Sequence, residues 1–176
     1  SNGLNLATLK FQPVAIIAGE NKAKLSTANI VLNIPPRNVN FTGREQAFKQ
    51  IQNSLTTQKI GVITQAISGL GGVGKTQLAT EFVYRAIEQK LYDIILWVTA
   101  ENTNSMNNAY REFANILAID IRGLQTTEMQ MLIHHKLIEQ HKNAKVLVIL
   151  DNVPNYGYIQ DYIALVNKQF SNNLPL

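Results

Sequence analysis

Eight consecutive residues, from Gly69 to Thr76, hold the strongest chemical signal in the sequence. They fit the pattern G-x-x-x-x-G-K-[ST], in which glycines let successive backbone N–H groups turn toward the oxygens of a phosphate. A helix predicted directly after this loop adds its free N-terminal donors and the positive end of its dipole. The pattern therefore predicts that the loop holds ATP or ADP, with Mg²⁺.

Two side chains at the end of the loop would complete the phosphate site. The ammonium group of Lys75 would bind the β- and γ-phosphates and assist catalysis, and the hydroxyl of Thr76 would be a ligand of Mg²⁺. The residues expected to contact the nucleotide in this segment are Gly69, Gly71, Gly72, Val73, Gly74, Lys75, Thr76 and Gln77.

A second candidate site residue follows the apolar run Val146–Leu150. A buried strand there would carry Asp151 to the C-terminal edge of a parallel sheet, where α/β folds bind ligands, and we expect this carboxylate to hold Mg²⁺ together with Thr76. The next residue is Asn152, whereas many P-loop ATPases have a second acid that deprotonates the attacking water. An amide can hydrogen-bond water but cannot accept its proton at neutral pH, so we expect Asn152 to allow slow hydrolysis or none.

The apolar pattern predicts strands and helices that alternate along the chain. Buried strands are predicted over residues 60–67, 94–98 and 146–150, and helices over 77–89, 105–117, 126–140 and 158–170. Strands that alternate with helices imply parallel crossovers. The expected fold is therefore α/β, a three-layer P-loop sandwich with a mainly parallel sheet.

The first 34 residues differ from the rest. Strand-like stretches at 11–18 and 29–34 flank a polar turn, so this segment is a hairpin, the tail of a preceding domain or a linker. Pro35 and Pro36 end it, because proline cannot donate to a strand ladder. We therefore expect an N-terminal extension over 1–34 and a nucleotide-binding domain over 35–176.

A helix is expected soon after the two prolines. Thr42 and Glu45 have the spacing of a capping box, in which each side chain satisfies a free backbone N–H at the helix start. The apolar side chains of Ala47, Phe48 and Ile51 then recur at helical spacing and would form one packed face.

Composition excludes several classes of function. The chain has 176 residues, enough for one domain, and its 45% hydrophobic and 16% charged residues favour a globular over a disordered chain. It contains no cysteine, which excludes thiolate metal sites and fits a reducing, cytoplasmic setting. No apolar run reaches the roughly 18 residues that cross a bilayer, so no membrane partner is expected. Lys and Arg are scattered, which disfavours a nucleic-acid partner.

Three histidines, His134, His135 and His141, lie on one predicted helix and at its end. No cysteine or nearby pair of acids completes a set of metal ligands with them, so we expect solvated helix histidines.

Four segments, taken in order, resemble the NB-ARC nucleotide-binding domains of the STAND class of signalling ATPases. They are Phe41-Thr42-Gly43-Arg44-Glu45, the loop Gly69–Thr76 followed by Gln77-Leu78-Ala79, then Ile95-Leu96-Trp97-Val98, and finally Leu147–Val153. Together they cover about two thirds of the chain. We interpret Trp97 itself as a large buried strand residue.

The resemblance implies a molecular switch. In such proteins ADP favours a closed resting state, and exchange for ATP permits oligomerisation and signalling. The expected partners are adenine nucleotide, other domains of the same full-length chain, and further copies of the protein when it is active. Phe41, Thr42 and Arg44 would lie against the adenine and ribose. Alternatively, Phe41 is a hydrophobic staple and Arg44 a solvated residue of the first helical turn.

The resemblance also predicts a gap in the sheet. In this class the strand after Asp151 lies between the Asp151 strand and the strand before the phosphate loop, and none is visible before Leu176. We therefore treat the chain as part of a longer protein, with a domain that is incomplete at its C-terminal end. The rest of the chain, the N-terminal hairpin or a neighbouring molecule would fill the gap.

Two other functions stay open on the sequence alone. An active AAA+-type ATPase acting on DNA or protein can also contain a Gly-Arg-Glu segment, although its loop usually reads differently and it carries the second acid. A P-loop kinase for a small molecule would need a lid and substrate-binding arginines, which are not recognisable. Whether the chain is an enzyme is therefore undecided.

Overall fold

The computed structural model describes residues 30–56, 60–64, 74–141 and 143–171. The elements in chain order are β1 (Ile30–Leu32), α1 (Glu45–Thr56), β2 (Ile60–Thr64), α2 (Lys75–Glu88), β3 (Ile94–Thr99), α3 (Thr103–Ile116), α4 (Thr126–Gln140), β4 (Val146–Asp151) and α5 (Tyr156–Ser171). The expected strand at 11–18 and most of the phosphate loop lie outside the described residues. None of the described helices is long and apolar enough to cross a membrane.

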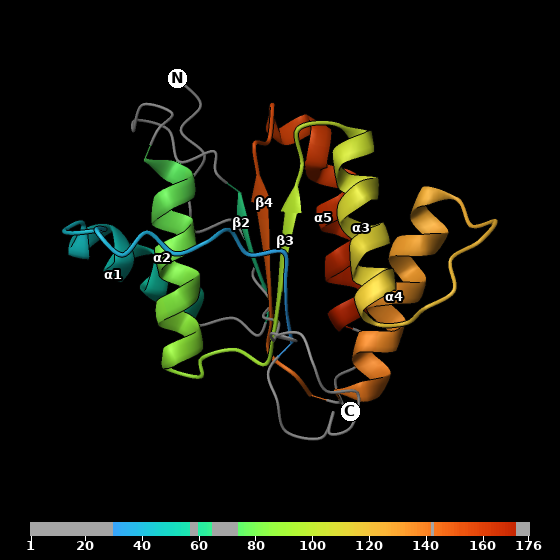
Figure 1. The fold of residues 1–176 in the computed structure, drawn as a ribbon, viewed down its shortest axis with the longest axis horizontal. Coiled ribbons are helices and arrows are strands. Elements are labelled where there is room, and N and C mark those ends of the chain that lie inside the picture. Colours follow the sequence, from blue (N-terminus) through green and yellow to red (C-terminus); the bar gives the residue numbers. More distant parts are fainter. Residues whose placement is uncertain (1–29, 57–59, 65–73, 142, 172–176) are drawn as a thin grey trace.

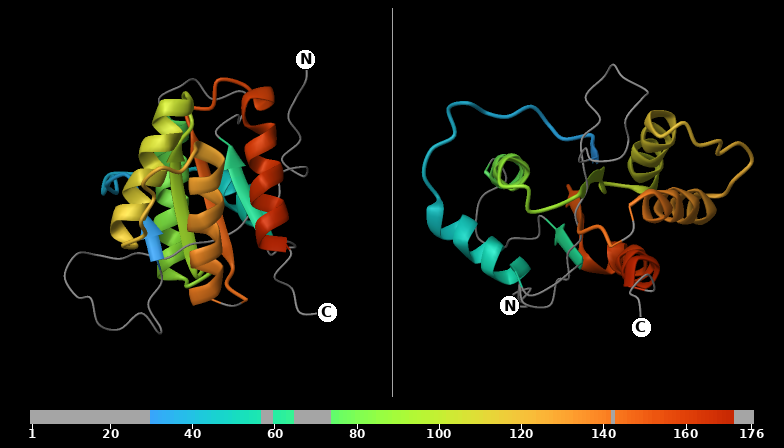
Figure 2. Two further views of the ribbon diagram at one scale, coloured as in Figure 1. Left: turned by 90° about the vertical axis from the view of Figure 1, so that its right-hand side faces the viewer. Right: turned by 90° about the horizontal axis from the view of Figure 1, so that it is seen from below.

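The described strands form one parallel sheet in the order β1-β3-β4-β2. Val148 of β4 pairs with Leu96 of β3 on one side and with Val62 of β2 on the other. Helices α1 and α2 lie on one face of the sheet, and α3, α4 and α5 cover the other (Figure 1). The view from below separates the two helical layers (Figure 2). The three-layer α/β fold expected from the sequence is therefore confirmed.

Burial explains why these segments take these forms. The apolar residues of Ile94–Val98 and Val146–Leu150 are all buried, as expected for parallel strands that are covered on both faces. Helix α3 buries one stripe at helical spacing, formed by Met106, Ala109, Tyr110, Phe113 and Ala114. Asn102 caps this helix, because its side-chain oxygen accepts a hydrogen bond from the Ser105 N–H at 3.0 Å.

The expected gap in the sheet is absent, and this prediction was wrong. Strand β2 pairs directly with β4 along its whole length, from Ile60 opposite Val146 to Thr64 opposite Leu150. The physical reason is backbone hydrogen bonding. Two apolar strands with no strand between them satisfy their N–H and C=O groups by pairing with each other.

Strand β1 lies in the segment that we assigned to an N-terminal extension. It pairs in parallel with the start of β3, with Ile30 opposite Ile94 and Leu32 opposite Leu96, and all three of its residues are buried. A parallel neighbour in the main sheet buries this apolar triplet on both faces, which a two-stranded hairpin cannot do.

The capping box expected from Thr42 and Glu45 does not form. Gly43 and Arg44 have φ angles of 81° and 63°, so the chain enters the helix only at Glu45. Glu45 is thus the first helical residue rather than the third. Its carboxylate accepts a hydrogen bond from the Arg85 guanidinium at 3.0 Å.

His134 departs from the expectation of a solvated side chain. It is 0% exposed, whereas the side chain of His135 is 62% exposed and lies 3.2 Å from the Glu139 carboxylate, as expected. Helices α3 and α5 both pack against α4, which widens the buried face of α4 beyond its apolar stripe. Both ring nitrogens of His134 have partners: Gln169 Oε1 at 2.5 Å from Nδ1, and the Tyr110 hydroxyl at 2.6 Å from Nε2.

The hydrogen bonds around His134 run in one direction across three helices. Gln169 Oε1 can only accept, so Nδ1 of His134 carries the proton and Nε2 accepts from the Tyr110 hydroxyl. The Tyr162 hydroxyl then donates to the Tyr110 oxygen at 2.5 Å. In this direction, the Tyr162–Tyr110–His134–Gln169 chain contains a neutral imidazole. Burial lowers the pKa of His134 to about 4, and the hydrogen bond to Gln169 offsets only part of the shift.

Acid should therefore destabilise the fold through His134. The unfolded chain binds a proton near the ordinary pKa of 6.5, before the folded chain does. The contribution of His134 to the free energy of unfolding is therefore fully present above pH 6.5 and is lost as the pH falls toward 4. The total loss is about 3 kcal/mol, because each unit of pKa difference corresponds to about 1.4 kcal/mol. Urea unfolding between pH 4.5 and 7.5 would measure this slope. The slope should flatten in His134→Gln and persist in the exposed control His135→Gln; equal slopes in both would contradict the assignment.

Candidate functional site

The described end of the phosphate loop forms the start of α2. Gly74 is the N-cap residue of this helix, Lys75 is its first residue and Thr76 its second. Gly69, Gly71, Gly72 and Val73 lie outside the described residues. Gly74 has no side chain that could cap the helix, and the positive end of the helix dipole lies at this first turn.

The two residues expected to hold Mg²⁺ lie together. Asp151 is the last residue of β4, opposite Thr99 of β3, and only 7% of it is exposed. The Thr76 hydroxyl donates to Oδ1 of Asp151 at 3.4 Å. A hydroxyl from the first turn of α2 and a carboxylate from the end of β4 thus meet at the C-terminal edge of the sheet.

The surroundings of the Asp151 carboxylate have opposing effects on its pKa. Burial raises its pKa, while hydrogen bonds from the Asn152 backbone N–H and from the Thr76 and Trp97 side chains lower it. The Trp97 contact was missed in the sequence, where Trp97 counted only as a buried residue. The position of Trp97 in the sequence could have revealed this contact. Thr99 is the strand partner of Asp151, and Trp97, two residues earlier, lies on the same face of the sheet.

Asn152 follows Asp151 at the exposed edge of the sheet. Its φ angle is 59°, a left-handed conformation that Asn adopts more readily than most residues. The chain therefore turns away from the strand at Asn152, directly beside the carboxylate.

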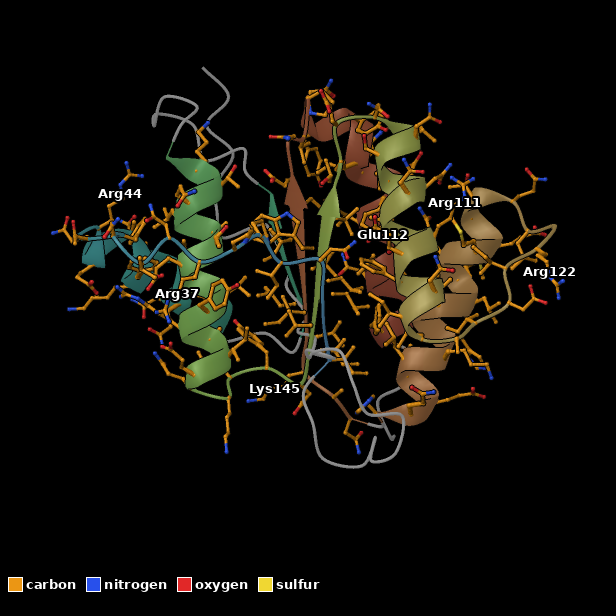
Figure 3. The ribbon with its side chains drawn as sticks, viewed as in Figure 1. Arg37, Arg44, Arg111, Glu112, Arg122 and Lys145 are labelled. Carbon is orange, nitrogen blue, oxygen red and sulfur yellow. The ribbon has the colours of Figure 1, made fainter. Side chains whose placement is uncertain are left out.

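Arg44 lies beside Gly74, the N-cap residue of helix α2. Its guanidinium donates to the Gly74 carbonyl at 3.3 Å, near the N-terminal end of α2 (Figure 3). A Cβ at position 74 would lie 2.6 Å from a guanidinium nitrogen of Arg44, so a side chain at this position would displace the end of the arginine. A cation at the positive end of a helix is unfavourable alone, and an anion bound between them would remove the repulsion.

Comparison with known proteins decides the family. The family model described as the NB-ARC domain matches residues 44–174, more than half of the chain. The chain belongs to the NB-ARC family. It is accordingly a nucleotide-binding domain of the signalling NTPase class.

Two relatives give the context of this NB-ARC domain. It is 35% identical, over 43% of its length, to a nucleotide-binding leucine-rich repeat (NLR)-like protein of Hyaloscypha variabilis. It is 24% identical, over 64% of its length, to a probable disease resistance RPP8-like protein 4 of Arabidopsis thaliana. The matched segments span 8% and 12% of these relatives. No solved structure matches the chain.

The other residues expected near the nucleotide have mixed placements. Phe41 is half-buried and packs edge-on against Phe48 of α1, with ring centroids 5.8 Å apart. Thr42 is exposed. Gln77 lies in the first turn of α2, and its Oε1 is buried without a hydrogen-bond partner in the described part of the chain.

An ion-pair network fastens residues 35–45 of the NB-ARC domain along α2. Glu81 of α2 accepts two hydrogen bonds from Arg37 and one from Arg85, all at 3.0 Å. Arg85 also pairs with Glu45 and lies over the Phe48 ring, 4.1 Å from its centroid. The hydrogen bond from Arg37 is the largest cause that lowers the pKa of Glu81. The i,i+4 spacing of Glu81 and Arg85 was the one sequence signal for this network.

Glu81 should contribute more to stability than its neighbour Glu88, which pairs with the same Arg37. The Glu81 side chain is 8% exposed and that of Glu88 is 56% exposed. Glu81→Gln should lower the free energy of unfolding by about 1–2 kcal/mol, because partly exposed arginines lose a charged partner. The matched Glu88→Gln should have a smaller effect that vanishes at high salt. Urea unfolding measures both, and equal losses would contradict the ranking.

Proposed function

We propose that this NB-ARC domain is the nucleotide-controlled switch of a multidomain signalling protein. It binds ATP or ADP with Mg²⁺, and exchange of ADP for ATP changes its conformation and permits oligomerisation. One observation carries the proposal: the Thr76 hydroxyl and the Asp151 carboxylate meet 3.4 Å apart beside the start of α2. A hydroxyl, a carboxylate and a helix N-terminus at one sheet edge are what a Mg²⁺–nucleotide site requires.

The donor set at this edge fits Mg²⁺. Mg²⁺ takes hard oxygen ligands and is usually held by one or two carboxylates, water and the phosphates of its nucleotide rather than by a cage of acids. Thr76 and Asp151 supply such oxygens. The described residues contain no group of three or more His, Cys, Asp or Glu side chains that would suit a different metal. When bound, Mg²⁺ would neutralise charge on the phosphates.

The remaining residues have separate roles in the proposal. Lys75 places its ammonium group on the β- and γ-phosphates, and the N–H groups at the start of α2 hold phosphate oxygens. Arg44, which lies beside Gly74, adds a second positive charge from outside the loop. Asn152 can orient a water molecule but cannot take its proton, so hydrolysis is slow and the bound nucleotide persists as a marker of state.

The proposed partners follow from the context of the relatives. The matched segments cover only about a tenth of the length of these relatives, so the signal that opens the switch and the output it drives are assigned to other domains of the same full-length protein. Self-association in the ATP state is the expected output step.

Calorimetric titration of ADP and ATP with Mg²⁺ tests the binding site. Lys75→Ala should weaken binding about tenfold to a hundredfold, because it removes one charge-assisted phosphate contact of roughly 1.5–3 kcal/mol. Asp151→Asn should weaken the nucleotide only when Mg²⁺ is present. Lys145→Ala removes an equal charge at the far end of β4 and should leave binding unchanged. Wild-type affinity that is insensitive to Lys75 would contradict the proposal.

Turnover tests the role given to Asn152. Asn152→Asp restores a potential proton acceptor beside Asp151, and general-base catalysis typically contributes 10²–10⁴-fold. We expect ATP hydrolysis by Asn152→Asp to be at least about tenfold faster than wild type, measured by phosphate release. Asn152→Ser, which keeps a neutral side chain, is the control. Robust wild-type turnover would instead favour an active AAA+-type ATPase.

A further inference from the structure

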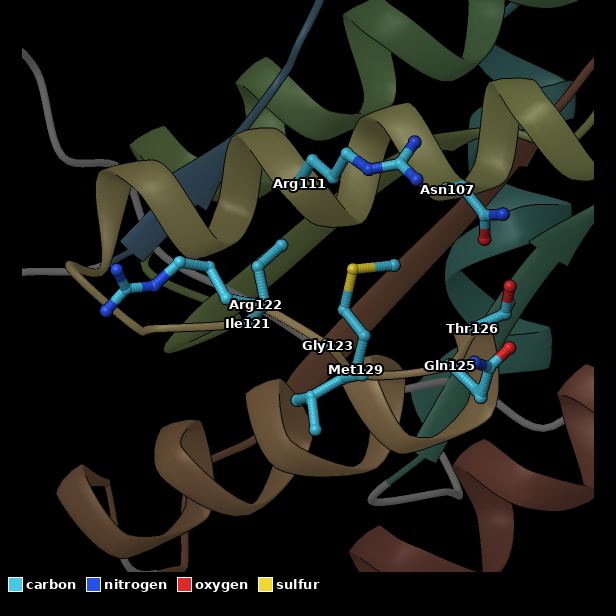
Figure 4. Close-up of a pocket in the computed structure, with 9 residues that line it drawn as sticks. Asn107, Arg111, Ile121, Arg122, Gly123, Gln125, Thr126 and Met129 are labelled. Atoms are coloured by element: carbon cyan, nitrogen blue, oxygen red, sulfur yellow. The ribbon is translucent and has the colours of Figure 1, made fainter.

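A pocket lies on the outer helical layer, away from the Asp151–Thr76 site. It is formed between α3, the residues that link α3 to α4, and the start of α4 (Figure 4). Its volume is about 410 Å³, within the usual range of ligand sites. The switch function does not use this pocket, and its lining combines a cation, a buried polar acceptor and an apolar floor.

The cation of the pocket is Arg111 on α3. It has no carboxylate partner in the described part of the chain, and its one hydrogen bond there goes to the neighbouring Asn108 at 3.2 Å. Arg122 provides a contrast within the same pocket, because its guanidinium is paired with Asp120 at 2.6 Å. Figure 4 shows Arg111 directed toward Asn107, whereas Arg122 extends away from it. Arg111 is therefore the guanidinium that is available to an added carboxylate.

The buried acceptor is the side-chain oxygen of Asn107. This Oδ1 is buried and accepts no hydrogen bond from the described residues. A buried polar atom without a hydrogen-bond partner costs free energy, so an N–H or O–H donor from a bound molecule would stabilise this oxygen. In Figure 4 it points across the pocket toward the start of α4.

The floor of the pocket is apolar. Met129 of α4 is 4% exposed and lies between Arg111 and the α4 start, with Ile121 beside it. Leu124, at the rim, is 38% exposed. An aliphatic group entering the pocket would contact Met129 and Ile121 and would cover Leu124.

We propose that this pocket binds a partner peptide segment in which an acidic residue stands next to an aliphatic one. The carboxylate pairs with the Arg111 guanidinium, the aliphatic side chain packs on Met129, and a backbone N–H donates to Asn107 Oδ1. A peptide supplies all three groups at neighbouring positions. A simple carboxylate has no hydrogen to donate to Asn107, and inorganic phosphate lacks the aliphatic group that would pack on Met129.

Titration of the ¹⁵N-labelled 176-residue chain with acetyl-Leu-Asp-Leu-amide tests the proposal by NMR. Amide shifts should change at the pocket residues and not around Thr76 and Asp151. The matched peptide acetyl-Leu-Asn-Leu-amide should bind at least about tenfold more weakly, because it lacks the charge. Arg111→Gln should cause the same loss, and Asn107→Ala a smaller one. Arg122→Gln should bind within about twofold of wild type, because its partner is Asp120.

Three results would overturn the proposal. The first is no pocket shift with wild type at 10 mM peptide. The second is equal binding of the two peptides, or loss of binding in Arg122→Gln that matches the loss in Arg111→Gln. The third is binding of butyrate or inorganic phosphate as tight as that of the acidic peptide, which would assign the pocket to a small anion. Arg111 and Arg122 are exposed, so both variants should keep the wild-type spectrum elsewhere.

Discussion

The position of β4 between β2 and β3 is the constraint on which the site depends. A parallel strand paired on both sides and covered by helices must be apolar throughout, and β4 is apolar up to its last residue. A carboxylate is tolerated at Asp151 because this last residue of β4 lies at the sheet edge, where the Thr76 hydroxyl of α2 can donate a hydrogen bond to it. The same register places Thr99 and, on the same face, Trp97 beside it. The strand pairing thus determines where the carboxylate lies and what surrounds it.

Helix α2 connects this edge to the segment before α1. Its first turn carries Lys75 and Thr76, and its middle carries Glu81, which binds Arg37 and Arg85. These arginines hold residues 35–45 along the helix, so the guanidinium of Arg44 reaches the Gly74 carbonyl. Helix α2 therefore relates two clusters, one that holds the segment in place and one at its N-terminal end, where the proposed nucleotide would bind.

Much of this arrangement could be predicted because it follows from local patterns. The apolar runs gave β3 and β4 within a residue, and the position of Asp151 after such a run placed it at the sheet edge. Two of the failures, at His134 and in the sheet, have a common origin in packing between distant segments. The sequence of α4 by itself predicts that His134 is a surface residue. Its burial is favourable only because Tyr110 of α3 and Gln169 of α5 supply hydrogen-bond partners to both ring nitrogens. The direct pairing of β2 with β4 likewise depends on partners that no local pattern specifies.

The environment of Asp151 is itself an argument for function. Burial raises the pKa of this carboxyl, so the ionised form is less stable here than in water, and a neutral amide of the same shape would avoid that cost. The Thr76 hydroxyl, the Asn152 N–H and the Trp97 side chain each favour the charged form but do not remove the effect of burial. In the proposed Mg²⁺ site, a bound cation would offset this desolvation and would use the Thr76 oxygen at the same time. Under the proposed function, the carboxylate at the end of β4 would be one half of an ion pair whose other half arrives with the nucleotide.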